Sequence, residues 1–221
     1  ATPQGVRDAE AFAHALSDAG LTIVSGLALG IDAAAHRGGL AGAGSSVAVI
    51  GTGLDRIYPA KNKALAHQLA ENGLIVSEFP LGTSPLPGHF PRRNRLISGL
   101  SRGVLVVEAA PDSGSLITAR VATEQGREVF AIPGSIHSPL SKGCHWLLKQ
   151  GAKLVECADD VLAELGQATP LPAGAPGSRA EGPGDPVLEA LGHAPASLDA
   201  LVLRTGQAAP ELAAQLTRLE L

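Results

Sequence analysis

The chain has 221 residues, of which 45% are hydrophobic and 3% aromatic, and its formal net charge at pH 7 is −4. This charge excludes a uniformly basic surface, so an anionic partner has to be held by a local patch. No apolar stretch approaches the ~18 residues of a membrane span, and no secretory leader is recognisable, so we expect a cytoplasmic protein with no membrane partner.

Short β-branched runs alternate with alanine-rich runs over residues 1–165. Strands are predicted at Leu21–Ser25, Ser46–Ile50, Gly73–Ser77, Gly103–Glu108, Glu128–Ile132 and Lys153–Val155. Helices are predicted at Val6–Ala19, Ile31–Ala41, Lys61–Asn72, Leu116–Gln125 and Cys144–Gln150. The strands are apolar almost throughout, which is typical of strands covered on both faces. The pattern therefore predicts an α/β fold, an extended Rossmann-like domain with a doubly wound, mostly parallel sheet.

The composition changes at residue 166. Residues 166–185 are mostly Gly, Pro, Ala and Ser, which predicts a flexible linker between two domains. Residues 186–221 predict three short helices, which begin near Pro186, Leu198 and Ala209. Three short helices with tight turns favour a small helical module that resembles part of a winged helix, and a plain helical tail is the alternative.

A cluster of positive charge follows Phe90. Arg92, Arg93 and Arg95 lie within four positions that also include Asn94, and arginine is suited to bidentate phosphate contacts. We expect this cluster where a loop enters a helix, since a helix start also attracts anions. Pro91 favours an extended conformation for the residue before it, so the Phe90 ring either stacks on a nucleobase or fills the core beneath the loop.

Glycine-rich and hydroxyl-rich segments follow the predicted strands, and ligands gather at these ends of a parallel sheet. Gly26 allows a phosphate to approach free backbone amides. Gly51 and Thr52 resemble a phosphate-cradling turn. Ser113 and Ser115 place hydroxyls at a helix start, where they act either as caps or as anion donors.

Groups suited to catalysis are scarce. The sequence contains no P-loop lysine, GxSxG, HExxH or CxxC pattern, and its two cysteines have no metal-ligand spacing. Asp32 and His36 share a helix face, where a structural pair is commoner than a catalytic one. The sequence therefore predicts binding rather than turnover, with no catalytic residue, cofactor or metal.

Taken in order, five segments resemble the DNA-processing protein A family (DprA/Smf), from about Ala1 to Leu165 and more weakly from Asp185. They are SGLALGID (25–32), GTGLDRIYP (51–59), FPRRNRLISGLS (90–101), VVEAAPDSGSLITA (106–119) and GREVFAIPG (126–134). The resemblance implies an extended Rossmann fold that binds single-stranded DNA, protects incoming DNA and helps to load RecA recombinase during natural transformation. It also implies a homodimer, for which the apolar residues Val155, Leu162 and Leu165 are candidate edge positions.

The resemblance also implies site residues. The DNA-contacting loop corresponds to Phe90, Arg92, Arg93, Asn94 and Arg95, and pocket positions correspond to Gly51, Thr52, Lys61, Ser113 and Ser115. The family sheet further implies an earlier strand that ends in a Gly-Thr-Arg or Gly-Ser-Arg turn. That strand is absent from these 221 residues, so we expect the sheet to lack its central strand here.

Two alternative functions are a nucleotide-processing enzyme and a regulator that binds duplex DNA. Related Rossmann-like enzymes process nucleoside monophosphates at a PGGxGTxxE pattern, which residues 112–118 with Glu124 do not match. A regulator that reads duplex DNA through its last helix needs base-reading side chains. That helix offers only Gln215, Thr217 and Arg218.

Overall fold

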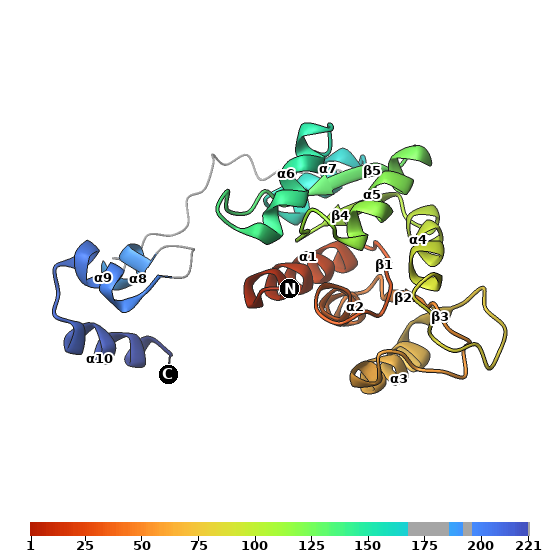
Figure 1. Cartoon of the computed structure of the whole chain (residues 1–221), viewed down its shortest axis with the longest axis horizontal. Helices are drawn as coiled ribbons and strands as arrows, with labels where there is room; N and C mark the ends of the chain where they lie inside the picture. Colours follow the sequence, from red (N-terminus) through yellow and green to blue (C-terminus); the bar gives the residue numbers. More distant parts are fainter. Residues whose placement is uncertain (168–185, 192–195, 221) are drawn as a thin grey trace. The chain divides into compact units, whose positions relative to one another are not determined.

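The computed structural model describes residues 1–167, 186–191 and 196–220, and the chain divides into two compact units, Ala1–Pro170 and Leu171–Leu221 (Figure 1). The strands of the first unit are β1 (Ile23–Ser25), β2 (Ser46–Val49), β3 (Leu74–Val76), β4 (Gly103–Val106), β5 (Glu128–Ala131) and β6 (Lys153–Leu154). Its helices are α1 (Pro3–Asp18), α2 (Ile31–Ala41), α3 (Lys63–Asn72), α4 (His89–Leu100), α5 (Gly114–Glu124), α6 (Lys142–Lys149) and α7 (Ala158–Glu164), with the 3₁₀ turns η1 (Ala60–Asn62) and η2 (Pro139–Ser141).

The predicted strands and helices of this unit are confirmed, and so is the α/β class with parallel strands. Helix α7 was not predicted. It begins after Cys157, and the Asp160 carboxylate accepts hydrogen bonds from the amides of Glu156 (2.7 Å) and Cys157 (3.1 Å). These bonds satisfy backbone donors that a helix start leaves open, and the one from Glu156 is the main cause of the lowered pKa of Asp160. An aspartate at this position is the sequence signal that could have predicted the helix.

The strands form two parallel sheets of three strands, in the orders β1-β2-β3 and β4-β5-β6. No ladder joins β1 to β4 within the described residues, so each of these strands is hydrogen-bonded along one edge only. A cavity of about 1030 Å³ lies against both strands and is also lined by α1, α4 and α5. The strands predicted to form one sheet are therefore divided between two sheets in the described residues.

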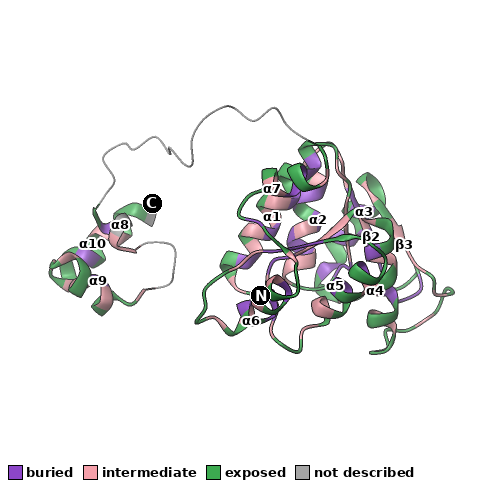
Figure 2. Ribbon diagram, turned by 90° about the horizontal axis from the view of Figure 1, so that it is seen from above, coloured by how far each residue is buried: buried purple, intermediate pink, exposed green. Residues whose placement is uncertain are grey.

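The core of the first unit consists mainly of Ala, Leu and Val, as the low aromatic content requires. Figure 2 shows buried positions on the helices where they face the interior of this unit. Two of the three apolar residues considered for a dimer edge, Val155 and Leu162, are buried in a cluster with Phe130 and Leu16. They therefore stabilise the unit itself and do not form a surface for self-association.

The start of α1 is fastened to the end of β4 by one carboxylate. Thr2 caps the helix by accepting a hydrogen bond from the Gly5 amide (2.9 Å), and Pro3 occupies the first turn. The Glu108 carboxylate accepts hydrogen bonds from the Thr2 amide (2.9 Å) and the Thr2 hydroxyl. Glu108 lies two residues after the end of β4, so this contact holds α1 beside the sheet β4-β5-β6.

The second unit contains α8 (Pro186–Leu191), α9 (Leu198–Thr205) and α10 (Ala209–Glu220), which confirms the three predicted helices. Val187, Leu201 and Leu212 form its buried centre. Gly206 ends α9 in the left-handed conformation, with φ of 69°, which glycine adopts at little cost. Most of the predicted linker, residues 168–185, lies outside the described residues.

Both cysteines are free thiols, with Cys144 buried and Cys157 exposed, and burial raises the pKa of the Cys144 thiol.

In the part of the chain that the structure describes, no group of three His, Cys, Asp or Glu side chains is placed to hold a metal ion. Over the same residues, no helix is both long enough and apolar enough to span a bilayer.

Candidate functional site

The arginine cluster lies inside a helix rather than in a loop that leads into one. Helix α4 begins at His89, so Phe90 and Pro91 already belong to its first turn. The expectation that Pro91 holds Phe90 extended is therefore wrong, because proline needs no amide donor in the first turn of a helix. Successive helical residues point about 100° apart, so the arginines diverge. Arg92 and Arg95 are exposed, whereas Arg93 is buried.

Arg93 links α4 to the ends of β1 and β2. Its Nη1 donates hydrogen bonds to the carbonyl oxygens of Gly26 (2.7 Å) and Val49, and the side chain is 5% exposed. A Cβ atom on Gly26 would lie 2.4 Å from Nη1, so glycine there makes room for the guanidinium. Burial lowers the pKa of Arg93, and the nearby Asp32 opposes this shift. Arg93 thus lies in the interior, away from the surface that its neighbours present.

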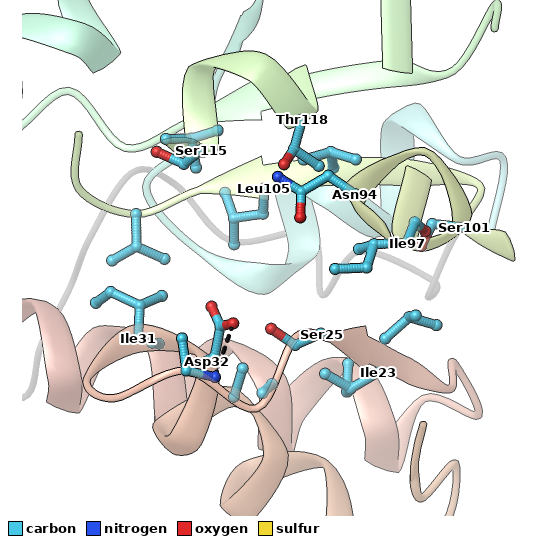
Figure 3. A pocket seen from close by; sticks show the side chains of 18 of the residues that line it. Ile23, Ser25, Ile31, Asp32, Asn94, Ile97, Ser101, Leu105, Ser115 and Thr118 are labelled. Carbon is cyan, nitrogen blue, oxygen red and sulfur yellow. Dashed lines mark hydrogen bonds between the residues drawn. The ribbon is translucent and has the colours of Figure 1, made fainter. Parts of the chain in front are cut away.

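The first three amides of the loop after β1, from Gly26 to Ala28, are already hydrogen-bonded. The Asp32 carboxylate accepts hydrogen bonds from the amides of Gly26 (3.1 Å) and Ala28 (3.2 Å), as Figure 3 shows in part. The amide of Leu27 donates to His36 Nε2 (3.2 Å). The expectation that a phosphate approaches free amides at Gly26 is therefore wrong, because side chains of α2 already bind them. Asp32 and His36 act as a structural pair that shapes this loop.

His36 is fully buried and neutral. Its Nε2 accepts from Leu27, so Nδ1 carries the proton and donates to the Ser46 hydroxyl (2.7 Å), which in turn donates to the Ile23 carbonyl (2.8 Å). Burial lowers the pKa of His36 to about 4; Asp32 opposes this shift and Arg93 adds to it. A proton on Nε2 would break the bond to the loop.

Five of the predicted residues line the cavity that lies against β1 and β4. They are Phe90, Arg93, Asn94, Ser113 and Ser115. Figure 3 shows Asn94 and Thr118 close together on one side of it, with Ser25 and Asp32 on the other side. Ser113 caps α5, and its hydroxyl accepts from the Ser115 amide (3.4 Å) and lies 2.7 Å from the Ser115 hydroxyl. The predicted capping role of Ser113 is thus present, and both serines also line the cavity.

A second group of residues lies where α4 meets the loops after β2 and β3. The rings of Tyr58 and Phe90 have centroids 5.6 Å apart, and those of Phe79 and His89 stack at 4.1 Å. The Arg92 guanidinium lies 5.9 Å from the centre of the Phe79 ring, within the range of a cation–π contact. We call Tyr58, Phe79, His89, Phe90 and Arg92 the ring cluster.

Of this cluster, only Phe90 and Arg92 were predicted as site residues from the sequence. Tyr58, Phe79 and His89 were missed as site residues, although Tyr58 and Phe79 each follow a predicted strand in a chain with few aromatic residues. That position at the carboxyl ends of two adjacent parallel strands is the signal that could have found them. Their proximity to Phe90 depends on the packing of α4.

The remaining predicted site residues differ in burial and in the contacts that they make. Gly51 is buried beneath Phe90, and a Cβ atom there would lie 3.1 Å from the Phe90 ring. Thr52 is also buried, and its hydroxyl donates to the Arg56 carbonyl (2.8 Å). Lys61 is exposed in η1. Arg95 forms an ion pair with Glu78 that leaves 48% of its side chain accessible.

Residues 1–166 match the family described as DNA recombination-mediator protein A, and residues 167–221 match the DprA winged helix domain. Protein Smf of Escherichia coli is 47% identical over 98% of this chain and 60% of its own length. The DNA processing protein DprA of Streptococcus pneumoniae is 54% identical over 73% of this chain and 57% of its own length.

Two solved structures share the fold. DNA processing protein A of S. pneumoniae matches 74% of this chain and 58% of its own, with a TM-score of 0.70 and 52% identity. The Helicobacter pylori protein, whose structure concerns a unique single-stranded DNA binding mode, matches 76% of both chains, with a TM-score of 0.70 and 32% identity. This chain thus spans about 60% of the first curated relatives. By the match to residues 1–166 and by its identity to these relatives, the chain belongs to the DNA recombination-mediator protein A family.

Proposed function

We propose that the chain binds single-stranded DNA, without sequence preference, at the surface formed by the start of α4 and the loops after β2 and β3. In the whole protein this binding protects incoming DNA and helps to load RecA recombinase onto it during natural transformation. The protein acts in the cytoplasm as a homodimer, and it binds DNA rather than catalysing a reaction. The roles in protection, RecA loading and dimerisation rest on membership of the family.

The observation that carries the proposal is the placement of two exposed arginines beside the aromatic rings of the ring cluster. Arg92 and Arg95 emerge from the first turns of α4, and the rings of Tyr58 and Phe90 lie next to that helix start. Arginine pairs with phosphate, and aromatic rings stack on bases that a duplex would keep paired. The H. pylori protein, whose structure concerns single-stranded DNA binding, shares this fold.

The test is the salt dependence of binding to single-stranded and duplex oligonucleotides of equal length. Arg92 and Arg95 engage about two phosphates, so the log–log slope of affinity against salt should be about −1.4. Arg92→Ala should make this slope shallower by about 0.7, whereas Arg7→Ala, at an exposed site on α1, should not change it. Equal affinity for duplex, or a slope unaffected by Arg92→Ala, contradicts the proposal.

The second unit is not part of the proposed DNA-binding surface. In α10, the candidate base-reading side chains are Gln215, Thr217 and Arg218, of which Gln215 is half-buried. We therefore expect a fragment of residues 1–166 to bind single-stranded DNA with the affinity of the whole chain. Fluorescence anisotropy on both proteins, with circular dichroism to establish that the fragment is folded, checks this. A fragment that is folded but binds more than about tenfold more weakly assigns part of the site to the second unit.

A further inference from the structure

Tyr58 is the only tyrosine in the chain, and it lies at the end of the loop after β2. Its side chain is 49% exposed, although it is among the larger hydrophobic residues of the protein. No hydrogen bond of its hydroxyl group occurs within the described residues. A half-exposed tyrosine ring leaves apolar surface open to a flat ligand, and tyrosine is enriched at interfaces because its ring is apolar and its hydroxyl is polar.

The loop that carries Tyr58 is fastened to the loop after β3. The Gly53 amide donates to the Thr83 carbonyl (3.1 Å), and the Gly82 amide donates to the Asp55 carboxylate (2.7 Å). The Arg56 Nε donates to the Gly82 carbonyl (3.0 Å). These hydrogen bonds hold the residues just before Tyr58 in place, so the segment that carries the ring is already ordered. A ligand that binds to this ring therefore causes little further loss of conformational entropy in the loop.

The other rings of the cluster already pack against neighbouring residues of the protein. Phe90 packs on Gly51, and Phe79 stacks on His89. All three aromatic neighbours, Phe79, His89 and Phe90, are less exposed than Tyr58. Phe90 lies against Tyr58 with ring centroids 5.6 Å apart and planes inclined at 32°. It therefore supports the tyrosine ring from one side.

The spacing of this pair determines how a base can bind. A base inserted between two rings needs two contacts of about 3.5 Å, so the rings would have to be roughly 7 Å apart. The 5.6 Å between the Tyr58 and Phe90 centroids is too short for that. A flat ligand can stack only on the part of the Tyr58 ring that Phe90 does not cover.

We infer that Tyr58, supported by Phe90, stacks against an unpaired nucleobase of the bound strand, beside the phosphates that Arg92 and Arg95 engage. This inference rests on the proposed function. Every base has a face that can stack, so the contact tolerates any sequence and requires a base that is not paired. Tyr58 is then the ring whose accessible face contacts the base, and Phe90 packs against Tyr58 and supports it.

The first experiment compares Tyr58→Ala and Tyr58→Phe in binding to a short oligothymidylate. Loss of the ring should weaken binding about tenfold, within the range measured for base stacking, and Tyr58→Phe should stay within about twofold of the original protein because it keeps the ring. Trp146→Ala removes a similarly exposed aromatic side chain, 50% exposed, from α6, outside the proposed surface, and should leave binding unchanged. Thermal melting establishes that each variant is folded.

The second arm uses an oligonucleotide with the same phosphates but with abasic sites in place of bases. On this probe the original protein and Tyr58→Ala should bind equally, since nothing remains to stack. An equal loss for Tyr58→Ala on both probes, or no loss on either, overturns the inference while leaving DNA binding intact. Failure of the original protein to bind oligothymidylate at all refutes the proposed function as well, so the two failures are distinguishable.

A chemical readout needs no substitution. Nitration by tetranitromethane can modify only one tyrosine in this chain, and oligothymidylate should protect it, whereas inorganic phosphate and the abasic oligonucleotide should not. Nitration at the same rate in the presence of saturating oligothymidylate overturns the assignment of Tyr58 to the bound surface. Protection by the abasic probe also overturns it, because coverage would then not depend on a base.

Discussion

Substitution of Arg93 by methionine is expected to lower the free energy of unfolding by about 2–6 kcal/mol, since a buried acceptor left without its donor costs about 1–3 kcal/mol. Methionine fills much of the same space but donates no hydrogen bond. The carbonyl oxygens of Gly26 and Val49 would both lose the Arg93 guanidinium. The loss is large beside the roughly 5–15 kcal/mol by which a typical domain is stable. Urea unfolding followed by circular dichroism measures it.

Arg92 provides the matched control, because it is the adjacent arginine on the same helix and is exposed. Arg92→Met should change stability by less than about 0.5 kcal/mol and should instead weaken binding to single-stranded DNA. A stability loss of similar size in both variants would show that Arg93 does not have the interior role assigned to it. Normal stability of Arg93→Met would contradict that role directly.

Acidification should destabilise the first unit through His36. The imidazole has its ordinary pKa of 6.5 in the unfolded chain and a pKa of about 4 in the folded one, so the unfolded state binds more protons between these values. The contribution of His36 is therefore fully present above about pH 6.5 and is lost as the pH falls towards 4. It amounts to about 3 kcal/mol, from roughly 1.4 kcal/mol for each pKa unit.

The measurement is the unfolding free energy in urea at a series of pH values, for the original protein and for His36→Gln. Glutamine has a side-chain oxygen that can accept from the Leu27 amide but does not titrate. The difference in stability between the two proteins should shrink by about 3 kcal/mol from neutral pH to pH 4. A constant difference over this range would mean that His36 does not titrate with a lowered pKa. Carboxylates that do not interact with His36 titrate alike in both proteins and cancel in the comparison.

Local pattern was sufficient to predict most elements and the family. The strand at Ser46–Val49 and the helix at Ile31–Ala41 follow from a β-branched run and an alanine-rich run that lie within single segments. The order of five short motifs identified the family, which the comparisons confirmed. Helix α4 was harder, because the arginines and Pro91 suggested a loop. The first turn of a helix accepts proline, and sequence alone does not say where that turn begins.

The sequence by itself determined which residue types are available to the site, but the tertiary structure decided what each one does. Arg92, Arg93 and Arg95 are chemically identical, yet only Arg93 finds two carbonyl acceptors, from segments 67 and 44 residues away. Tyr58 and Phe90 are brought together by the packing of α4 against a loop that precedes it by some thirty residues. The unpaired edges of β1 and β4 likewise depend on neighbours in space. The periodicity of the sequence indicates which face of a helix or strand is apolar. Contacts between residues that are distant in the sequence form only when the elements pack against one another.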